Sequence, residues 1–244
     1  MFEDIYFVDD RLLVIEEREV LAAEERLNIS LPQGYKRFLK VFGEGTYCGV
    51  IDIPSPAEMQ RVSKEYRWKR GLKVLGEEEI SNSIEIASTV DCDSIIYCPG
   101  SERGVYVLPR HDDTIYWIDS NFDDPCVWHS DSGLVREMEP LKYFEPFVDR
   151  ACLEVIVGKG LYSLDKLISK VKDEFTPESE LLHHSYIDIE LLFVKEISAI
   201  IEFSSDGQHV RFDFHPLYEN RIYSLISRLE KEGVIGELKL IAHQ

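Results

Sequence analysis

Residues 21–43 read LAAEERLNISLPQGYKRFLKVFG, and this stretch decides the fold expected for the first part of the chain. Proline is well placed at the first position of a helix, so Pro32 marks where a helix begins. Four apolar residues after it recur at i, i+3, i+4 and i+7, a spacing that puts them on one helix face. They are Tyr35, Phe38, Leu39 and Phe42, and Gly43 supplies the stop after them.

A second, earlier helix is expected because Val20, Ala23 and Leu27 also share a helical face. Residues 28–31 join the two helices. Aromatic stripes at helical spacing usually lie in a core. The stretch therefore predicts a packed corner of two short helices, with the aromatic face of the second helix buried.

The order of residues in this corner resembles the opening signature of the SUKH superfamily. The resemblance rests on Glu24-Glu25-Arg26-Leu27, Leu31-Pro32, Tyr35, Phe38-Leu39 and the glycine-containing turn that follows. The superfamily includes the Smi/Knr cell-wall synthesis regulators of fungi and many bacterial immunity proteins. The resemblance continues to about residue 150. It implies a non-enzymatic protein that binds and blocks a toxin domain, often a nuclease, or a related regulator or signalling scaffold.

The pattern of elements predicts an α+β fold over residues 1–150, with helices packed on a mainly antiparallel sheet. Residues 46–53 are expected to form a strand. Ser55-Pro56-Ala57-Glu58 has the composition of a capping box and predicts a helix that stops near Gly71. Residues 84–118 are typical of an antiparallel meander, and residues 139–150 are expected to form a final helix.

Residues 153–244 are expected to form a smaller α+β extension or a small second domain. Helical spacing predicts helices over residues 161–175 and 217–231. Alternation predicts strands at residues 187–191, 199–203 and 209–215. In the last of these strands Val210, Phe212 and Phe214 should face inward.

The charge of the chain restricts its partners. A net charge of -19, from 46 acidic and 27 basic residues, argues against direct binding of nucleic acid or of an anionic membrane, because both need a cationic surface. It fits a basic protein partner, although a soluble acidic protein would show the same balance. The chain shows neither a signal peptide nor a stretch of membrane-spanning length, so a cytoplasmic protein is expected. The five cysteines include no C-x-x-C pair and are expected to be reduced.

None of the common phosphate-loop, dinucleotide, nucleophile-elbow or H-E-x-x-H motifs is present, so no catalytic residue, metal ligand or cofactor is assigned. The loops are rich in acidic residues and histidines at His111, Asp112, Asp113, Asp119, Asp123, Asp124 and His129. Oxygen ligands suit calcium, but the EF-hand pattern is missing, and solvated loop carboxylates are the simpler interpretation. A metal-dependent hydrolase using these loops is the alternative function.

The candidate contacts to a protein partner, which the resemblance implies is a basic toxin domain, are acidic loop residues together with two tryptophans, a residue type favoured at interface hot spots. They are Asp91, Asp93, Asp112, Asp113, Trp117, Asp119, Asp123, Asp124 and Trp128. The oligomeric state is left open by the sequence.

Overall fold

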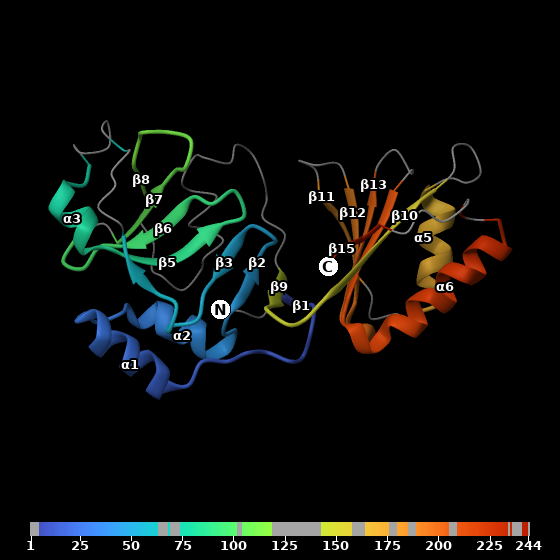
Figure 1. Cartoon of the computed structure of the whole chain (residues 1–244), viewed down its shortest axis with the longest axis horizontal. Helices are drawn as coiled ribbons and strands as arrows, with labels where there is room; N and C mark the ends of the chain where they lie inside the picture. Colours follow the sequence, from blue (N-terminus) through green and yellow to red (C-terminus); the bar gives the residue numbers. More distant parts are fainter. Residues whose placement is uncertain are drawn as a thin grey trace. The chain divides into compact units, whose positions relative to one another are not determined.

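The computed structural model describes residues 5–62, 68, 74–101, 104–118, 143–157, 164–175, 180–184, 189–204, 209–233, 235 and 241–243. The chain forms two compact units (Figure 1). The first comprises Met1–Tyr6 and Arg11–Phe147, and the second comprises Phe7–Asp10 and Val148–Gln244. Both are built from helices and antiparallel strands, which confirms the predicted α+β class.

The first unit is organised around a nine-stranded sheet with the order β1-β9-β2-β3-β5-β6-β7-β8, and β4 pairs with β5 outside this path. The strands are β1 (Tyr6–Phe7), β2 (Gly45–Tyr47), β3 (Ile51–Ile53), β4 (Gln60–Arg61), β5 (Ile84–Thr89), β6 (Ser94–Tyr97), β7 (Val105–Leu108), β8 (Tyr116–Ile118) and β9 (Tyr143–Pro146). The pairings from β9 to β8 are antiparallel. Strands β5 to β8 form the predicted meander.

Helices α1 (Glu17–Leu27) and α2 (Gln33–Val41) form the predicted corner, and α3 (Glu77–Asn82) is a short helix before β5. The left-handed backbone of Asn28, with φ 51°, ends α1, and that of Gly43, with φ 77°, follows α2. The predicted inner faces of both helices are buried, and the side chains of Tyr35, Phe38, Leu39 and Phe42 are completely so.

Helix α2 packs on the sheet through its aromatic side chains. The Phe38 ring lies 5.6 Å from that of Tyr47 on β2 and 6.1 Å from that of Phe144 on β9, measured between ring centroids. The buried Tyr35 hydroxyl donates a hydrogen bond of 2.6 Å to the carbonyl of Ile86 on β5. Three strands are thereby tied to one helix face.

The helix predicted to begin at Pro56 does not form over residues 56–62; residues 63–67 and 69–71, over which it was expected to continue, lie outside the described residues. Glu58 N–H bonds to the Ser55 carbonyl at 3.0 Å, so the capping sequence makes a single turn, and the chain continues as β4. The reason is a contact from a distant residue. The Arg26 guanidinium on α1 donates to the carbonyls of Pro56, Ala57 and Met59, at 2.9, 3.3 and 2.9 Å, and holds this segment in a non-helical path.

The helix predicted over residues 139–150 is also wrong, because Tyr143–Pro146 is strand β9 and pairs with β2. Aromatic residues suit a buried strand as well as a helix, and Pro146 would cost a helix one hydrogen bond. Gly45 permits the pairing, since a Cβ there would lie 2.4 Å from the Glu145 carbonyl oxygen. The strand expected over residues 46–53 is in fact two strands, β2 and β3, joined by a turn at residues 48–50.

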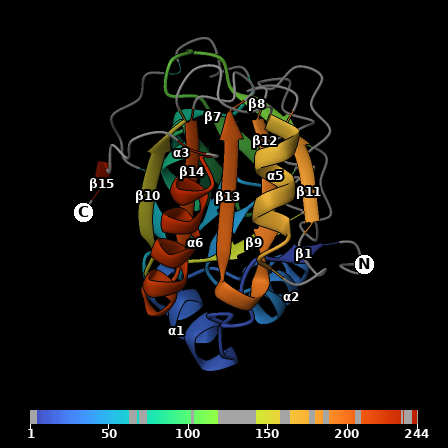
Figure 2. The same cartoon turned by 90° about the vertical axis from the view of Figure 1, so that its right-hand side faces the viewer.

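The second unit is a six-stranded antiparallel sheet with the order β11-β12-β13-β14-β10-β15. Its strands are β10 (Ala151–Ile156), β11 (Glu180–His184), β12 (Ile189–Val194), β13 (Ala199–Ser204), β14 (His209–Phe214) and β15 (Ile241–His243). The helices α5 (Leu164–Lys172) and α6 (Glu219–Lys231) cover one face (Figure 2). Two 3-10 turns lie at η2 (Lys195–Ile197) and η3 (Pro216–Tyr218).

The core of the second unit lies between this sheet and its helices. Val210, Phe212 and Phe214 of β14 face inward as predicted and pack with Leu225 and Ile226 of α6. Strands β10, β11 and β15 had not been predicted, because their short runs lack a clear alternation of apolar and polar residues.

The expectation that all cysteines are reduced is wrong for Cys48, which is disulfide-bonded. Cys92, Cys98 and Cys152 are free thiols, as expected. Residue spacing alone did not reveal this bond, because pairing of cysteines that are distant in sequence depends on the folded chain.

Candidate protein-binding surface

Two acidic turns lie at the same end of the first sheet. Asp91 and Asp93 follow β5, and Asp112 and Asp113 lie between β7 and β8. Because β5, β6, β7 and β8 run antiparallel in sequence order, both connections leave the sheet at one end. The Asp93 carboxylate also accepts a 2.7 Å hydrogen bond from the backbone N–H of Arg110, which links the two turns directly.

The carboxylate of Asp112 is fixed in its turn. It accepts hydrogen bonds from the hydroxyl and the backbone N–H of Thr114, each at 3.0 Å, and from the Tyr116 hydroxyl at 3.2 Å. Bonds from Thr114, with a smaller contribution from Tyr116, lower the pKa of the Asp112 carboxyl. This exposed group is therefore ionised at neutral pH and carries its charge in a defined position.

Of the other predicted contact residues, Trp117 lies on β8 opposite Tyr106 and is 43% exposed. Asp119, Asp123, Asp124 and Trp128 lie outside the described residues, as does His129. His111 is exposed in the turn with Asp112. The structure thus brings the two acidic turns together, and the role of the whole set as partner contacts stays a prediction.

The metal alternative has no support in the described part of the chain. There, no group of three or more His, Cys, Asp or Glu side chains is arranged so that it could hold a metal ion. The Asp112 carboxylate accepts hydrogen bonds from Thr114 in its own turn and from Tyr116 at the start of β8, as a turn-forming aspartate does. Solvated and turn-forming carboxylates account for the described members of the acidic loop set.

A polar row crosses the face of the sheet that is turned away from α1 and α2. The pairings place Glu145 beside Thr46, Thr46 beside Asp52, Asp52 beside Ser88, and Ser88 beside Ser94. All five side chains are partly exposed, whereas their strand neighbours Tyr47, Ile51 and Ile53 are buried. Since side chains alternate between the faces of a strand, one face forms the core and the other, polar face meets solvent.

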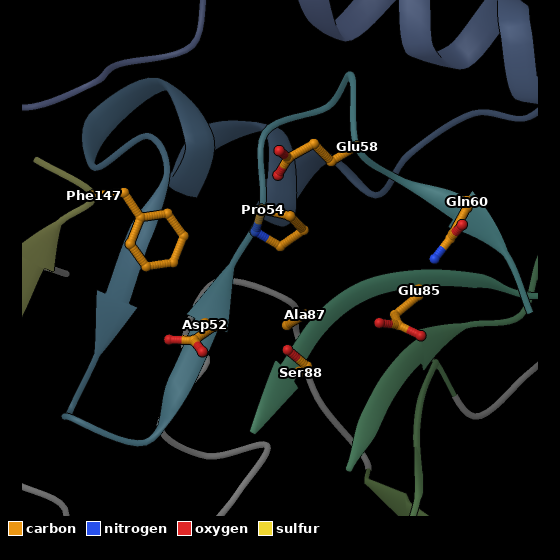
Figure 3. Close-up of a pocket in the computed structure, with 8 residues that line it drawn as sticks. All are labelled: Asp52, Pro54, Glu58, Gln60, Glu85, Ala87, Ser88 and Phe147. Atoms are coloured by element: carbon orange, nitrogen blue, oxygen red, sulfur yellow. The ribbon is translucent and has the colours of Figure 1, made fainter. Parts of the chain in front are cut away.

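A hollow of about 210 Å³ lies on this polar face (Figure 3). It is lined by Asp52, Pro54, Glu58, Gln60, Glu85, Ala87, Ser88 and Phe147. Figure 3 shows the phenylalanine ring at one side of the hollow and the three carboxylates distributed around it. We call these eight residues the acidic hollow; they include three acids and no basic residue.

Two of these carboxylates are positioned by hydrogen bonds to neighbouring strands. Asp52 accepts a bond of 2.7 Å from the Thr46 hydroxyl, and Glu85 accepts one of 2.9 Å from the Ser94 hydroxyl. Burial raises the pKa of the nearby Glu44 carboxyl, and repulsion by Glu58 and by Glu19 raises it further. Negative charge is therefore concentrated at this part of the sheet.

The sequence did not identify the acidic hollow. Its residues come from β3, β4, β5, the segment before β4 and the end of β9, and only the pairing of these strands brings them together. Phe147 was expected on the apolar face of a helix, but it follows β9 and is 45% exposed. The available signal was the strand alternation around Asp52 and Glu85, which puts polar side chains on one face.

In the part of the chain that the structure describes, none of the helices has the length and apolar character needed to cross a membrane.

Comparison with curated proteins and with solved structures found no match. A family model does match: the SMI1 / KNR4 family (SUKH-1), over residues 15–125. This region contains α1, α2 and the sheet from β2 to β8. The first unit is thus similar to the SUKH-1 family over this region, in agreement with the resemblance predicted from residues 24–39.

Proposed function

We propose that the protein is a non-enzymatic binding module that captures a basic protein partner, as an immunity protein against a toxin domain such as a nuclease, or as a related regulator. The similarity to the SUKH-1 family supports a role of this general kind. The observation that carries the proposal is the acidic end of the sheet, where the turns of Asp93 and Asp112 are linked through Arg110.

The physical basis is electrostatic attraction. The net charge of -19 produces a field that accelerates the approach of a cationic protein. The ordered carboxylates of Asp93 and Asp112 then offer acceptors whose positions are set before binding, which reduces the entropy lost in the complex. Trp117, which is partly exposed on β8, supplies apolar area close to these charges.

The first experiment is affinity capture of the full chain from its native host, followed by an assay of whether the purified protein blocks the activity of the captured partner. The second measures association kinetics with that partner at low and high salt. The double variant Asp112→Asn with Asp113→Asn should slow association, because electrostatic steering acts mainly on the on-rate. The on-rate of the wild type should fall as salt rises, since the Debye length shortens from about 10 Å at 0.1 M to about 3 Å at 1 M.

A matched control removes the same charge elsewhere. Glu17→Gln with Glu25→Gln neutralises two exposed carboxylates, both on α1 of the first unit and outside the acidic turns. Its on-rate should stay close to that of the wild type. An on-rate that is indifferent to salt and equal in both double variants would rule out the acidic turns as the steering surface. A captured partner whose activity is unaffected by saturating protein would rule out neutralisation.

A further inference from the structure

We propose that the acidic hollow on the polar sheet face receives an arginine side chain of the protein partner. This inference rests on the proposed function in one respect only, namely that the partner is a protein. It concerns a different surface from the acidic turns: they lie in connections at the sheet end, whereas the hollow lies over β3, β4 and β5.

The first argument is the state of the sheet face. Thr46, Asp52 and Ser88 form adjacent cross-strand pairs, and each is partly exposed, so this face meets solvent. Phe147 beside them exposes 45% of its surface. Aromatic residues, phenylalanine among them, are enriched in protein–protein interfaces, so this exposed ring favours a protein as the partner.

The second argument is size. The hollow measures about 210 Å³, whereas sites for small-molecule ligands and cofactors usually have roughly 300–1,000 Å³. A nucleotide or a similar ligand is therefore too large to be enclosed. One long side chain that enters from a partner surface suits the space better.

The third argument is charge and geometry. Asp52, Glu58 and Glu85 supply negative charge, and no basic residue lines the hollow. These three acids do not converge tightly enough to hold a metal ion; the same is true of every such group among the described residues. Carboxylates that are spread around a space match a group with several separated donors.

The guanidinium group of arginine has that distribution of donors. It presents five N–H groups in a planar fork and also stacks on aromatic faces, whereas the ammonium group of lysine is a compact and strongly hydrated charge. In Figure 3 the Phe147 ring lies beside the space between the carboxylates, where it is available to such a group. The combination of carboxylates and an exposed ring favours arginine over lysine.

The test uses the full chain labelled with ¹⁵N and three capped tripeptides as probes: acetyl-Gly-Arg-Gly-amide, its lysine analogue and its glutamine analogue. The arginine peptide should shift the backbone amide signals of Asp52, Glu85 and Phe147. It should bind more tightly than the lysine peptide, and the glutamine peptide should leave these signals unchanged. Such short probes bind weakly, so affinities are taken from titrations at constant low salt.

Variants of the hollow should weaken binding of the arginine peptide. Phe147→Ala should weaken it about two- to fivefold, the value of an exposed cation–π contact. Asp52→Asn and Glu85→Gln should each weaken it by up to about fivefold. Both replacements keep the oxygen that accepts the bond from Thr46 or from Ser94, so the fold is retained. Leu217→Ala and Glu25→Gln are the matched controls, because both residues are exposed and lie outside the hollow.

The proposal is overturned if the glutamine peptide produces the same shifts, if the arginine peptide shifts other signals instead, or if the hollow variants bind like the controls. These outcomes concern only the hollow and do not affect the proposed function, which the capture experiment tests. Conversely, a captured partner that binds equally to wild type and to Phe147→Ala with Glu85→Gln would refute the hollow and retain the proposed function. Capture without neutralisation would refute the immunity role and would not change the interpretation of the peptide result.

Discussion

Replacement of Phe38 by alanine tests whether the aromatic corner organises the first unit. The Phe38 side chain is completely buried. Its ring stacks on that of Phe42 at 4.5 Å and meets the edges of the Tyr47 and Phe144 rings at 5.6 and 6.1 Å. These contacts join α2 to β2 and β9, so loss of the ring opens a cavity at the junction of three elements.

The expected cost follows from these contacts. Truncation of a buried phenylalanine to alanine destabilises a protein by about 3–5 kcal/mol. We expect the upper part of this range, because the ring has three aromatic neighbours and each pair adds about 0.5–1.5 kcal/mol beyond the buried area. For a protein of this size such a loss lowers the melting temperature by about 8 to 20 °C.

The assay is urea denaturation followed by tryptophan fluorescence. The three tryptophans, Trp68, Trp117 and Trp128, all fall in the part of the sequence that forms the first unit, so the signal reports its unfolding. Circular dichroism follows both units, and comparison of the two probes shows whether they unfold together. Val41→Ala, at an exposed position of the same helix, is the control and should change stability by less than about 1 kcal/mol. A loss below about 1 kcal/mol for Phe38→Ala, or one equal to the control, would refute the assignment of this face to the core.

Two further changes test the same unit. Tyr35→Phe should cost about 1–3 kcal/mol, because it leaves the buried Ile86 carbonyl without its donor. Burial raises the pKa of the Tyr35 hydroxyl far above the value of about 10 for an unfolded chain. Its contribution to stability is therefore complete below pH 10 and lost as the pH rises above it, and Tyr35→Phe should remove this part of the alkaline dependence, measured by urea denaturation between pH 8 and pH 11. Gly43→Ala should be more destabilising than Gly100→Ala in thermal unfolding: both glycines have positive φ, but a Cβ at Gly43 would lie 1.9 Å from the Leu13 carbonyl oxygen, while at Gly100 it would meet nothing within 4 Å. Equal losses for the two glycines would contradict the close approach.

The elements that the sequence predicted correctly depend on local patterns. The buried face of Tyr35 and Phe38 follows from helical spacing, and the inward side chains of β14 follow from strict alternation. The two wrong helices show where local patterns are insufficient. Residues 55–58 have the composition of a helix start, but Arg26, some thirty residues earlier, binds the carbonyls that a helix would need.

The candidate surface was predictable only in part for the same reason. The acidic turns could be placed at one sheet end because a meander brings alternate connections together. The acidic hollow could not, since Asp52, Glu85 and Phe147 are separated by 33 and 62 positions and become neighbours only through strand pairing. Phe147 reaches this place because β9 pairs with β2. The sequence had predicted a helix over residues 139–150, which contain β9, so this pairing was not foreseen.

The basic residues of the described chain help to explain how an acidic protein leaves its carboxylates free for a partner. Arg26 and Arg61 donate to backbone carbonyls of the first unit, which places these cations in structural roles. In the second unit, Arg211 forms a pair with Asp213, and Arg221 one with Glu196. Cations committed to contacts within the chain cannot neutralise the surface elsewhere. The excess negative charge therefore remains at surfaces that these cations do not contact. The acidic hollow is such a surface, because its lining contains three acids and no basic residue. In the function proposed above, this charge favours basic partners over acidic ones.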